Sequence, residues 1–362
     1  MRRLPQLFVV MLLAIGFAVV SETIARAFTI VTVHVGINPG QSAVIPQTNE
    51  VVVINFGSND VSVIDPVTLK VSTVPAGSLP SDVAVNPATG YAYVVNSWGN
   101  SVTAFYGYGE GKKRRTIPVG VGPVAVTVNP ALNKVYVVNN GEGTISIIDE
   151  NAATTTKLPV GQRPWKVAVN AATNRAYVVN IWSNSVSVLD GVSDGVIDTI
   201  PVGMEPYAVV ANPVTNRIYV ANSGSGTISV IDGTTHAMYE IPAGIQPVLL
   251  AVNTATNMIY AADGQRNDIM VIDGATNATT HLTMAVGQWG MTGFSALSVN
   301  EATNRIYVTD NMAENINVID GATNQVTLRP VGTYPGGTTI NPATNKVYVS
   351  HANDGTVTII SE

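Results

Sequence analysis

The chain has 362 residues, of which 46% are hydrophobic and only 12% charged, and its formal net charge is −6. This composition supplies enough apolar material for a large core and is unlike that of a disordered chain. The acidic balance argues against nucleic acid as a partner, because such binding needs a basic surface. Cysteine is absent, which excludes disulfides, thiolate metal sites and a thiol nucleophile.

The beginning of the chain has the features of a secretory signal peptide. Arg2 and Arg3 give a positive start, and residues 7–20 form an apolar run that is shorter than the roughly 20 residues needed to span a bilayer. Ala25-Arg26-Ala27 then matches an Ala-x-Ala cleavage signal. We predict that residues 1–27 are a signal peptide cleaved after Ala27, with an uncleaved N-terminal anchor as the alternative. Cleavage would leave the mature chain in the periplasm or outside the cell, without stable membrane insertion.

After this segment, the dominant feature is a Tyr-Val-x-Asn phrase that recurs about every 42 residues. Strong copies begin at Tyr93, Tyr136, Tyr177 and Tyr219, weaker copies begin at Tyr260, Tyr307 and Tyr348, and a further copy covers Val52–Asn55. A fixed spacing of this size indicates that one small structural unit is repeated eight times.

The repeat at residues 201–242 shows how each unit is built. Residues 207–212 predict a first strand, A, and a turn containing Asn and Pro leads to a second strand, B, at 217–222. A loop rich in Ser and Gly precedes a third strand, C, at 227–232, and another turn leads to a fourth strand, D. Four short strands joined by turns predict an antiparallel meander.

The pattern of apolar residues predicts how these units pack. The strands are apolar on both faces, as residues 208–211 illustrate, and such a sheet needs a neighbour on each side, which a closed ring provides. We therefore predict an all-β fold in which residues 28–362 form a single β-propeller of four-stranded antiparallel blades, with eight blades and with seven as the alternative. The last repeat stops after its C strand at 356–360, and residues 28–36 predict a spare D strand. Pairing of the N-terminal strand with the last blade should close the ring.

The repeat resembles the YVTN family of β-propellers, which is named for its second strand. The resemblance covers about residues 28–362 and includes Asn-Pro-Ala-Thr-Asn at Asn341–Asn345 and Ile-Asp-Gly-Ala-Thr-Asn at Ile272–Asn277 and Ile319–Asn324. These motifs are turn and strand residues, so the resemblance implies the fold and carries over no activity. The family includes surface-layer and periplasmic proteins, and seven blades are common in it.

In a propeller the D–A and B–C loops share one face, which we call the top face, and the A–B and C–D turns share the bottom face. The turns repeat nearly unchanged whereas the loops vary, which favours the top face as the place for a specific site. The candidate ligand-binding residues in these loops are Trp98, Arg163, Trp165, Trp182, Glu205, Tyr207, Gln246, Trp289 and Tyr334. Aromatic residues ringed by polar ones would suit a sugar, peptide or aromatic ligand. The alternative is that each tryptophan packs on a neighbouring loop and seals a junction between blades.

A second signal is the last position of the repeated phrase, which changes from Asn in the first five repeats to Asp263, Asp310 and His351 in the last three. Two carboxylates and an imidazole on adjacent blades suggest a divalent metal or an acid–base site. A strand spacing of about 4.8 Å would separate these positions by roughly 10 Å, which is wide for one ion. The alternative is that Asp replaces Asn as a loop cap. No cofactor is predicted beyond this metal.

The sequence contains no Gly-x-Ser-x-Gly, Walker, His-Glu-x-x-His or Rossmann motif. Our leading hypothesis is an exported, non-enzymatic binding scaffold that holds a protein, glycan or small-molecule ligand on the top-face loops around the central channel. One alternative is a metal-assisted lyase or lactone hydrolase on the same face, which would use Asp263, Asp310, His351 and Glu314. A second alternative is a surface-layer or adhesive component.

Overall fold

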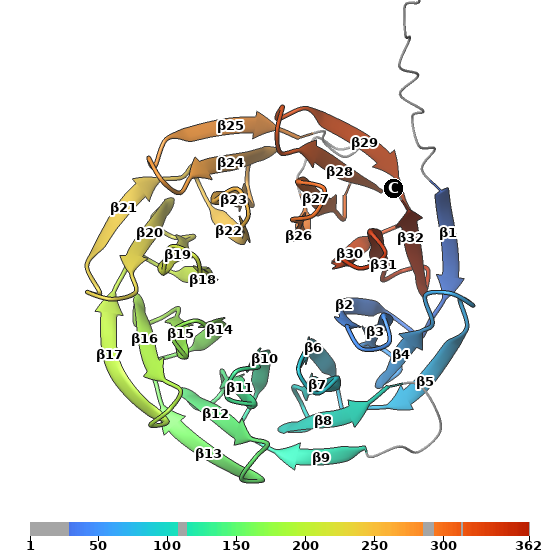
Figure 1. The fold of residues 1–362 in the computed structure, drawn as a ribbon, viewed down its shortest axis with the longest axis horizontal. Coiled ribbons are helices and arrows are strands. Elements are labelled where there is room, and N and C mark those ends of the chain that lie inside the picture. The colour runs from blue at the N-terminus through green and yellow to red at the C-terminus, as the bar shows by residue number, and fades with distance from the viewer. Residues whose placement is uncertain (1–28, 108–113, 285–292, 313, 362) are drawn as a thin grey trace, which may run out of the picture.

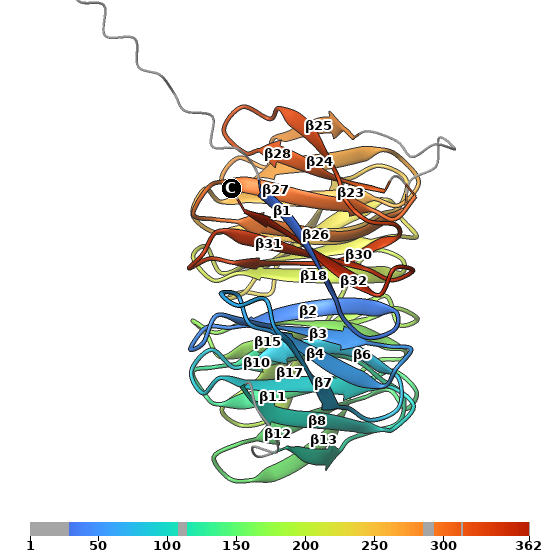
Figure 2. The same ribbon diagram turned by 90° about the vertical axis from the view of Figure 1, so that its right-hand side faces the viewer.

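The computed structural model describes residues 29–107, 114–284, 293–312 and 314–361. In this part of the chain the regular elements are β-strands, and they form eight four-stranded sheets. The sheets stand like blades around a central axis (Figure 1), and Figure 2 shows the ring edge-on. The prediction of an all-β propeller with eight blades is confirmed, and the seven-bladed alternative is wrong. Within the described residues, nothing helical has the length and apolar character that a membrane crossing requires.

Each blade runs from an innermost A strand to an outermost D strand. Blade 1 contains β2 (Pro39–Ile45), β3 (Glu50–Asn55), β4 (Asp60–Ile64) and β5 (Val71–Pro75); blade 2 contains β6 (Pro80–Val85), β7 (Tyr91–Asn96), β8 (Ser101–Tyr106) and β9 (Arg115–Pro118). Blade 3 contains β10 (Pro123–Asn129), β11 (Lys134–Asn139), β12 (Thr144–Asp149) and β13 (Thr154–Pro159); blade 4 contains β14 (Pro164–Asn170), β15 (Arg175–Asn180), β16 (Ser185–Asp190) and β17 (Gly195–Pro201). Blade 5 contains β18 (Pro206–Asn212), β19 (Arg217–Asn222), β20 (Thr227–Asp232) and β21 (Met238–Pro242); blade 6 contains β22 (Pro247–Asn253), β23 (Met258–Asp263), β24 (Asp268–Asp273) and β25 (Thr279–Thr283). Blade 7 contains β26 (Phe294–Asn300), β27 (Arg305–Asp310), β28 (Asn315–Asp320) and β29 (Val326–Pro330); blade 8 contains β30 (Pro335–Asn341), β31 (Lys346–His351), β32 (Thr356–Ser361) and, as its outer strand, β1 (Thr29–His34).

The ring is closed by strands from opposite parts of the chain. Strand β1 pairs antiparallel with β32, from Thr29 opposite Ser361 to His34 opposite Thr356. Both views place the two strands side by side (Figures 1 and 2). The prediction that the N-terminal strand completes the last blade is therefore confirmed, and β32 has no open edge to pair with another molecule. The predicted signal peptide, residues 1–27, lies outside the described residues.

The core lies between neighbouring blades. The tyrosine of the repeated phrase is among the largest fully buried side chains, at Tyr93, Tyr136, Tyr177, Tyr219, Tyr260, Tyr307 and Tyr348. Between blades 4 and 5, for example, Tyr177 and Val188 pack in one cluster with Val209 and Val220. Burial stabilises such side chains by roughly 25 cal/mol per Å² of apolar surface. Since each blade is buried on both faces by its neighbours, the ring as a whole is the stable unit.

On the bottom face, five-residue turns that begin with Asn, and in most blades also end with Asn, join neighbouring blades. Asn212, at the end of β18, accepts hydrogen bonds at Oδ1 from the backbone N–H groups of Val214 and Thr215, and it donates from Nδ2 to Oδ1 of Asn257 in blade 6. Asn257 has a φ of +56°, in the left-handed region that Asn tolerates better than most residues. Equivalent amide bonds run from Asn86 to Asn133, Asn129 to Asn174, Asn170 to Asn216 and Asn253 to Asn304. The first Asn of each turn therefore caps its own turn, and the last Asn accepts a hydrogen bond from the first Asn of the preceding blade.

On the top face, the last residue of the Tyr-Val-x-Asn phrase anchors the loops. Asn96 is fully buried, and its Oδ1 accepts a hydrogen bond of 2.9 Å from the backbone N–H of Gly77 in the loop that enters blade 2. Its Nδ2 donates to Ser101 Oγ and Thr103 Oγ1 on β8. Asn139 makes the same contacts with Gly120 and β12. The variable loops of the top face therefore rise from a constant, hydrogen-bonded base.

Candidate ligand-binding site

The D–A loops present their side chains from an unusual backbone conformation. The residue before the loop proline has a positive φ of between 51° and 59° at Asn38, Leu79, Arg163, Glu205 and Tyr334, whereas blade 3 has Gly122 there. For a residue with a side chain, this left-handed conformation costs about 1–2 kcal/mol. Strain of this kind is often retained at functional positions. Arg163, Glu205 and Tyr334 are exposed at these positions, so their side chains are accessible on the top face.

Hydrogen bonds hold the loops of blades 4 and 5 in place. The carbonyl of Arg163 accepts from the N–H of Ile181, and the N–H of Gln162 donates to Ser183 Oγ at 2.7 Å. In blade 5, the carbonyl of Glu205 accepts from both the N–H and the Oγ of Ser223. These bonds join each D–A loop to the B–C loop of the same blade, so the side chains they carry are preorganised.

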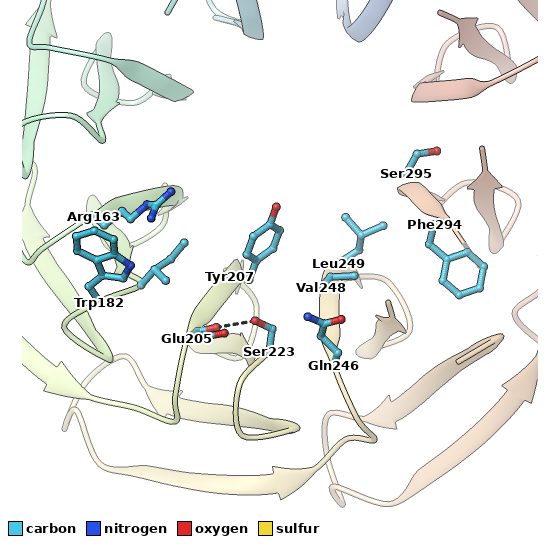
Figure 3. A pocket seen from close by; sticks show the side chains of 11 residues that line it. Arg163, Trp182, Glu205, Tyr207, Ser223, Gln246, Val248, Leu249, Phe294 and Ser295 are labelled. Atoms are coloured by element: carbon cyan, nitrogen blue, oxygen red, sulfur yellow. Dashed lines mark hydrogen bonds between the residues drawn. The ribbon is translucent and has the colours of Figure 1, made fainter. Parts of the chain in front are cut away.

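A pocket of about 580 Å³ lies across the top-face loops and inner strands of blades 4 to 7. Its lining residues are Arg163, Ile181, Trp182, Glu205, Tyr207, Ser223, Gln246, Val248, Leu249, Phe294 and Ser295. Figure 3 shows Arg163 and Trp182 at one end, Phe294 and Ser295 at the other, and Tyr207 and Leu249 between them. The volume falls in the usual range for a small-molecule site, and the lining combines apolar walls with a few polar groups, as ligand pockets do.

At one end of this pocket, Arg163 lies over the ring of Trp182, with its Cζ 4.8 Å from the ring centroid. This is a cation–π contact, which is worth about 0.5–1 kcal/mol at an exposed site. Trp182 is 64% exposed, so the contact orders two side chains that would otherwise move freely in solvent. Both residues also line a second pocket of about 480 Å³, together with Asn140, Gly141, Glu142, Gly143 and Gln162 of the adjoining loops.

Behind the pocket, Trp165 supports Tyr207. Their ring centroids are 5.4 Å apart at an angle of 39°, a tilted aromatic pair. Trp165 is half-buried and packs against the apolar cluster between blades 4 and 5, so it fits the junction-sealing alternative. Tyr207 is exposed and reaches the pocket itself.

The structure thus separates the predicted binding residues into groups. Five of them line the first pocket: Arg163, Trp182, Glu205, Tyr207 and Gln246. Trp98 and Tyr334 are exposed but line neither pocket, and Trp289 lies outside the described residues. Six lining residues were not predicted from the sequence as site residues: Ile181, Ser223, Val248, Leu249, Phe294 and Ser295. A signal for two of them existed, because Val248 and Ser295 occupy the same strand position as Trp165 and Tyr207.

The three residues proposed for a metal site do not come together. Among the described residues, no three His, Asp or Glu side chains form a group that could hold a metal ion, and Asp263, Asp310 and His351 are all described. Asp263 instead accepts backbone N–H bonds from Ile245 at Oδ2 and from Gln265 at Oδ1. Its carboxylate therefore joins the two top-face loops of blade 6, as the loop-cap alternative predicts.

Asp310 and His351 likewise bond within their own blades. Asp310 Oδ1 accepts hydrogen bonds from the backbone N–H groups of Gly293, in the D–A loop that enters blade 7, and Met312, in the B–C loop of the same blade. His351 is fully buried, and its Nε2 lies 2.8 Å from Thr358 Oγ1 on β32. Burial disfavours the charged imidazolium and lowers the pKa of His351 to about 4. This histidine is therefore neutral at ordinary pH and replaces Asn as a hydrogen-bonding anchor.

Comparison with solved structures shows the same architecture in proteins of different activities. Hydrazine synthase from Kuenenia stuttgartiensis is similar with a TM-score of 0.64 and 17% identity over 91% of this chain and 97% of that one. Virginiamycin B lyase from Staphylococcus aureus gives a TM-score of 0.63 and 11% identity, covering 93% of this chain and all of the other. A dihydro-heme d1 dehydrogenase gives 0.69 and 15%, covering 85% of this chain and 69% of that one.

These likenesses show the propeller fold alone, because the identities are low and the activities differ. No protein-family model matches the sequence, and no curated protein matches it. Membership of the YVTN family therefore stays a prediction from the repeat, and the fold is the conclusion that the comparisons support: the chain is an eight-bladed β-propeller.

Proposed function

We propose that this chain is an exported propeller of the YVTN type that binds a ligand on its top face, without performing chemistry on it. The observation that carries the proposal is the gathering of Arg163, Trp182, Glu205, Tyr207 and Gln246 at one pocket of about 580 Å³. These five residues were predicted from the sequence because they lie in the variable loops of the top face, whereas the turns of the bottom face repeat nearly unchanged. The proposal of export rests on the signal-peptide pattern of residues 1–27.

The build of the pocket supports binding. The loops that carry its residues are tied to each other by the hydrogen bonds of Arg163 and Glu205, so little conformational entropy is lost when a ligand is bound. Exposed aromatic rings supply contact area, and Gln246 and Ser223 supply directional hydrogen bonds. Rigid loops, aromatic anchors and few polar groups together favour recognition of a specific ligand.

The enzyme alternative has no matching support. Asp263 and Asp310 use their carboxylates to cap loops, and His351 is buried beside Thr358. Glu314, the remaining residue of that hypothesis, is exposed in the B–C loop of blade 7 and lines neither pocket. These residues therefore suggest no shared site for a lyase or hydrolase.

The test uses two exposed tryptophans of the top face as a matched pair. Trp182 lines the pocket, whereas Trp98, which is 79% exposed, does not. A library of small molecules and glycans should be screened against the mature protein by thermal shift, and each hit titrated by calorimetry. Trp182→Ala and Tyr207→Ala should weaken binding at least about 10-fold while leaving the melting temperature within a few degrees. Trp98→Ala should bind as the parent does. Hits that bind all variants equally, or a library without hits, would count against this site.

A further inference from the structure

Arg163 stands at the junction of two pockets. It lines the pocket of about 580 Å³ over blades 4 to 7 and also the pocket of about 480 Å³ toward blade 3. Trp182 is the other residue that the two linings share. Each pocket is large enough for a small ligand by itself. A ligand that contacts Arg163 can therefore extend into both pockets.

The guanidinium of Arg163 is available to a ligand. Among the described residues it makes a cation–π contact with the face of Trp182 and forms no salt bridge to a carboxylate. Glu142, the acidic residue of the second pocket, is instead paired with Lys157 at 3.0 Å and accepts from Thr144. Hydrogen bonds from guanidinium to carboxylate are among the strong ones, since both groups are charged and the geometry is bidentate. The junction of the pockets is thus suited to an anionic group.

The remaining lining residues indicate what carries this anionic group. The linings place polar side chains among the aromatic rings: Gln246 and Ser223 in the first pocket, and Asn140 and Gln162 in the second. Glu205 adds a carboxylate to the first pocket, which can accept hydrogen bonds from sugar hydroxyls. Amides can donate to and accept from the hydroxyls of a sugar, and an exposed aromatic ring can pack on the apolar face of a sugar ring.

We propose that the ligand of this site is an acidic oligosaccharide. Arg163 would bind the carboxylate of a central uronate residue, with the neighbouring sugar rings in the two pockets on either side. This inference rests on the proposed function and deepens it, because it assigns a ligand class to the same face. The position of Arg163 between the pockets, and not at the far end of one, favours a charge within the chain of the ligand over a charge at its end.

Calorimetric titration of the mature protein tests this assignment. The probes are hexamers of galacturonate, mannuronate and hyaluronan, the fully methyl-esterified galacturonate hexamer, and a hexaglutamate peptide. We expect at least one acidic hexamer to bind, more weakly at higher salt. For the galacturonate hexamer, the uncharged ester should bind at least about 10-fold more weakly.

Three variants assign the effect to Arg163. Arg163→Gln should weaken binding of the acidic hexamer by about 10- to 100-fold, and Arg163→Lys should fall between the two because it keeps the charge without the bidentate geometry. Arg266→Gln is the matched control, since Arg266 is an exposed top-face arginine that lines neither pocket, and it should bind as the parent does.

The outcomes separate this inference from the proposed function. If no acidic hexamer binds, if ester and acid bind equally, if Arg163→Gln has no effect, or if hexaglutamate alone binds, the acidic oligosaccharide is ruled out. A neutral ligand whose binding still depends on Trp182 and Tyr207 would leave the proposed function in place while overturning this inference.

Discussion

Asn212 of blade 5 donates its side-chain amide to Oδ1 of Asn257 in blade 6, at a distance of 2.8 Å. Both ends of the repeated bottom-face turn take part, because Asn212 begins the turn of blade 5 and Asn257 ends the turn of blade 6. A motif that looks like local turn chemistry therefore also holds the ring together.

The contribution of this hydrogen bond to stability can be measured by comparing alanine variants of Asn212 and Asn300. Both are buried and cap their own turns, but Nδ2 of Asn300 has no hydrogen-bond partner in the part of the chain that the structure describes. Asn212→Ala should lower the free energy of unfolding by about 1 kcal/mol more than Asn300→Ala, the usual net value of one hydrogen bond. Denaturant titration gives both values. Equal losses would show that the bond between blades contributes nothing.

The pH dependence of stability should contain a contribution from His351. Its pKa is lowered to about 4 by burial, so the native state stays neutral while the unfolded state takes up a proton below its ordinary pKa of about 6.5. The free energy of unfolding should therefore fall as the pH drops from about 6.5 to 4, by on the order of 3 kcal/mol in total. Above pH 6.5 both states are neutral, and this group has no effect.

His351→Asn provides the test, because Asn is the residue at this position in blades 1 to 5 and can bond to Thr358 in the same way. Thermal and denaturant unfolding at pH 7 and pH 4.5 should show a smaller pH difference for this variant than for the parent. His34→Asn, at an exposed position, serves as the control. If His351→Asn keeps the parental slope, the buried imidazole is not its source.

The left-handed backbone at Glu205 predicts that Gly and Ala substitutions at this position differ in stability and have the same effect on ligand affinity. Glu205→Gly should match or exceed the stability of Glu205→Ala, by up to about 1 kcal/mol, because glycine adopts a φ of +51° without steric cost. Both variants remove the pocket carboxylate, so both should change ligand affinity alike. Melting temperatures and titrations of the two variants together decide the matter, and a glycine variant less stable than the alanine variant would contradict the strain.

Ring closure predicts the effect of removing β1. A chain that starts at residue 36 lacks the strand that pairs with β32 from Thr29 to His34, and it also loses Val33 and Val35 from the cluster between blades 8 and 1. We expect a lower melting temperature and self-association through the exposed edge of β32, compared with a chain that starts at residue 28. Light scattering after size exclusion measures the association. A synthetic peptide of residues 28–36 should restore the monomer, and a truncated chain that is already monomeric and equally stable would argue against closure by this pair.

The sequence by itself determined the repeating unit and the closing strand, and it predicted eight blades with seven as the alternative. These follow from local rules, because Tyr177 and its equivalents recur at a fixed spacing and strands that are apolar on both faces need neighbours on each side. The sequence also pointed to Arg163, Trp182 and Glu205, since they differ from the repeat in loops of one face. It could not show that these side chains meet at one pocket, nor that Trp165 lies behind Tyr207.

Only the tertiary structure decided how residues of different blades are grouped. Asp263, Asp310 and His351 look like a cluster when the repeats are compared. The structure shows instead that Asp263 and Asp310 each cap loops of their own blade and that His351 bonds to Thr358 of its own blade, because the blades are splayed around the axis. Leu249 is an ordinary strand residue in the sequence, and it becomes a pocket wall because its strand begins at the channel mouth. The repeated sequence determines the four strands and turns of each blade, whereas the curvature of the ring determines which side chains from separate blades line the same pocket.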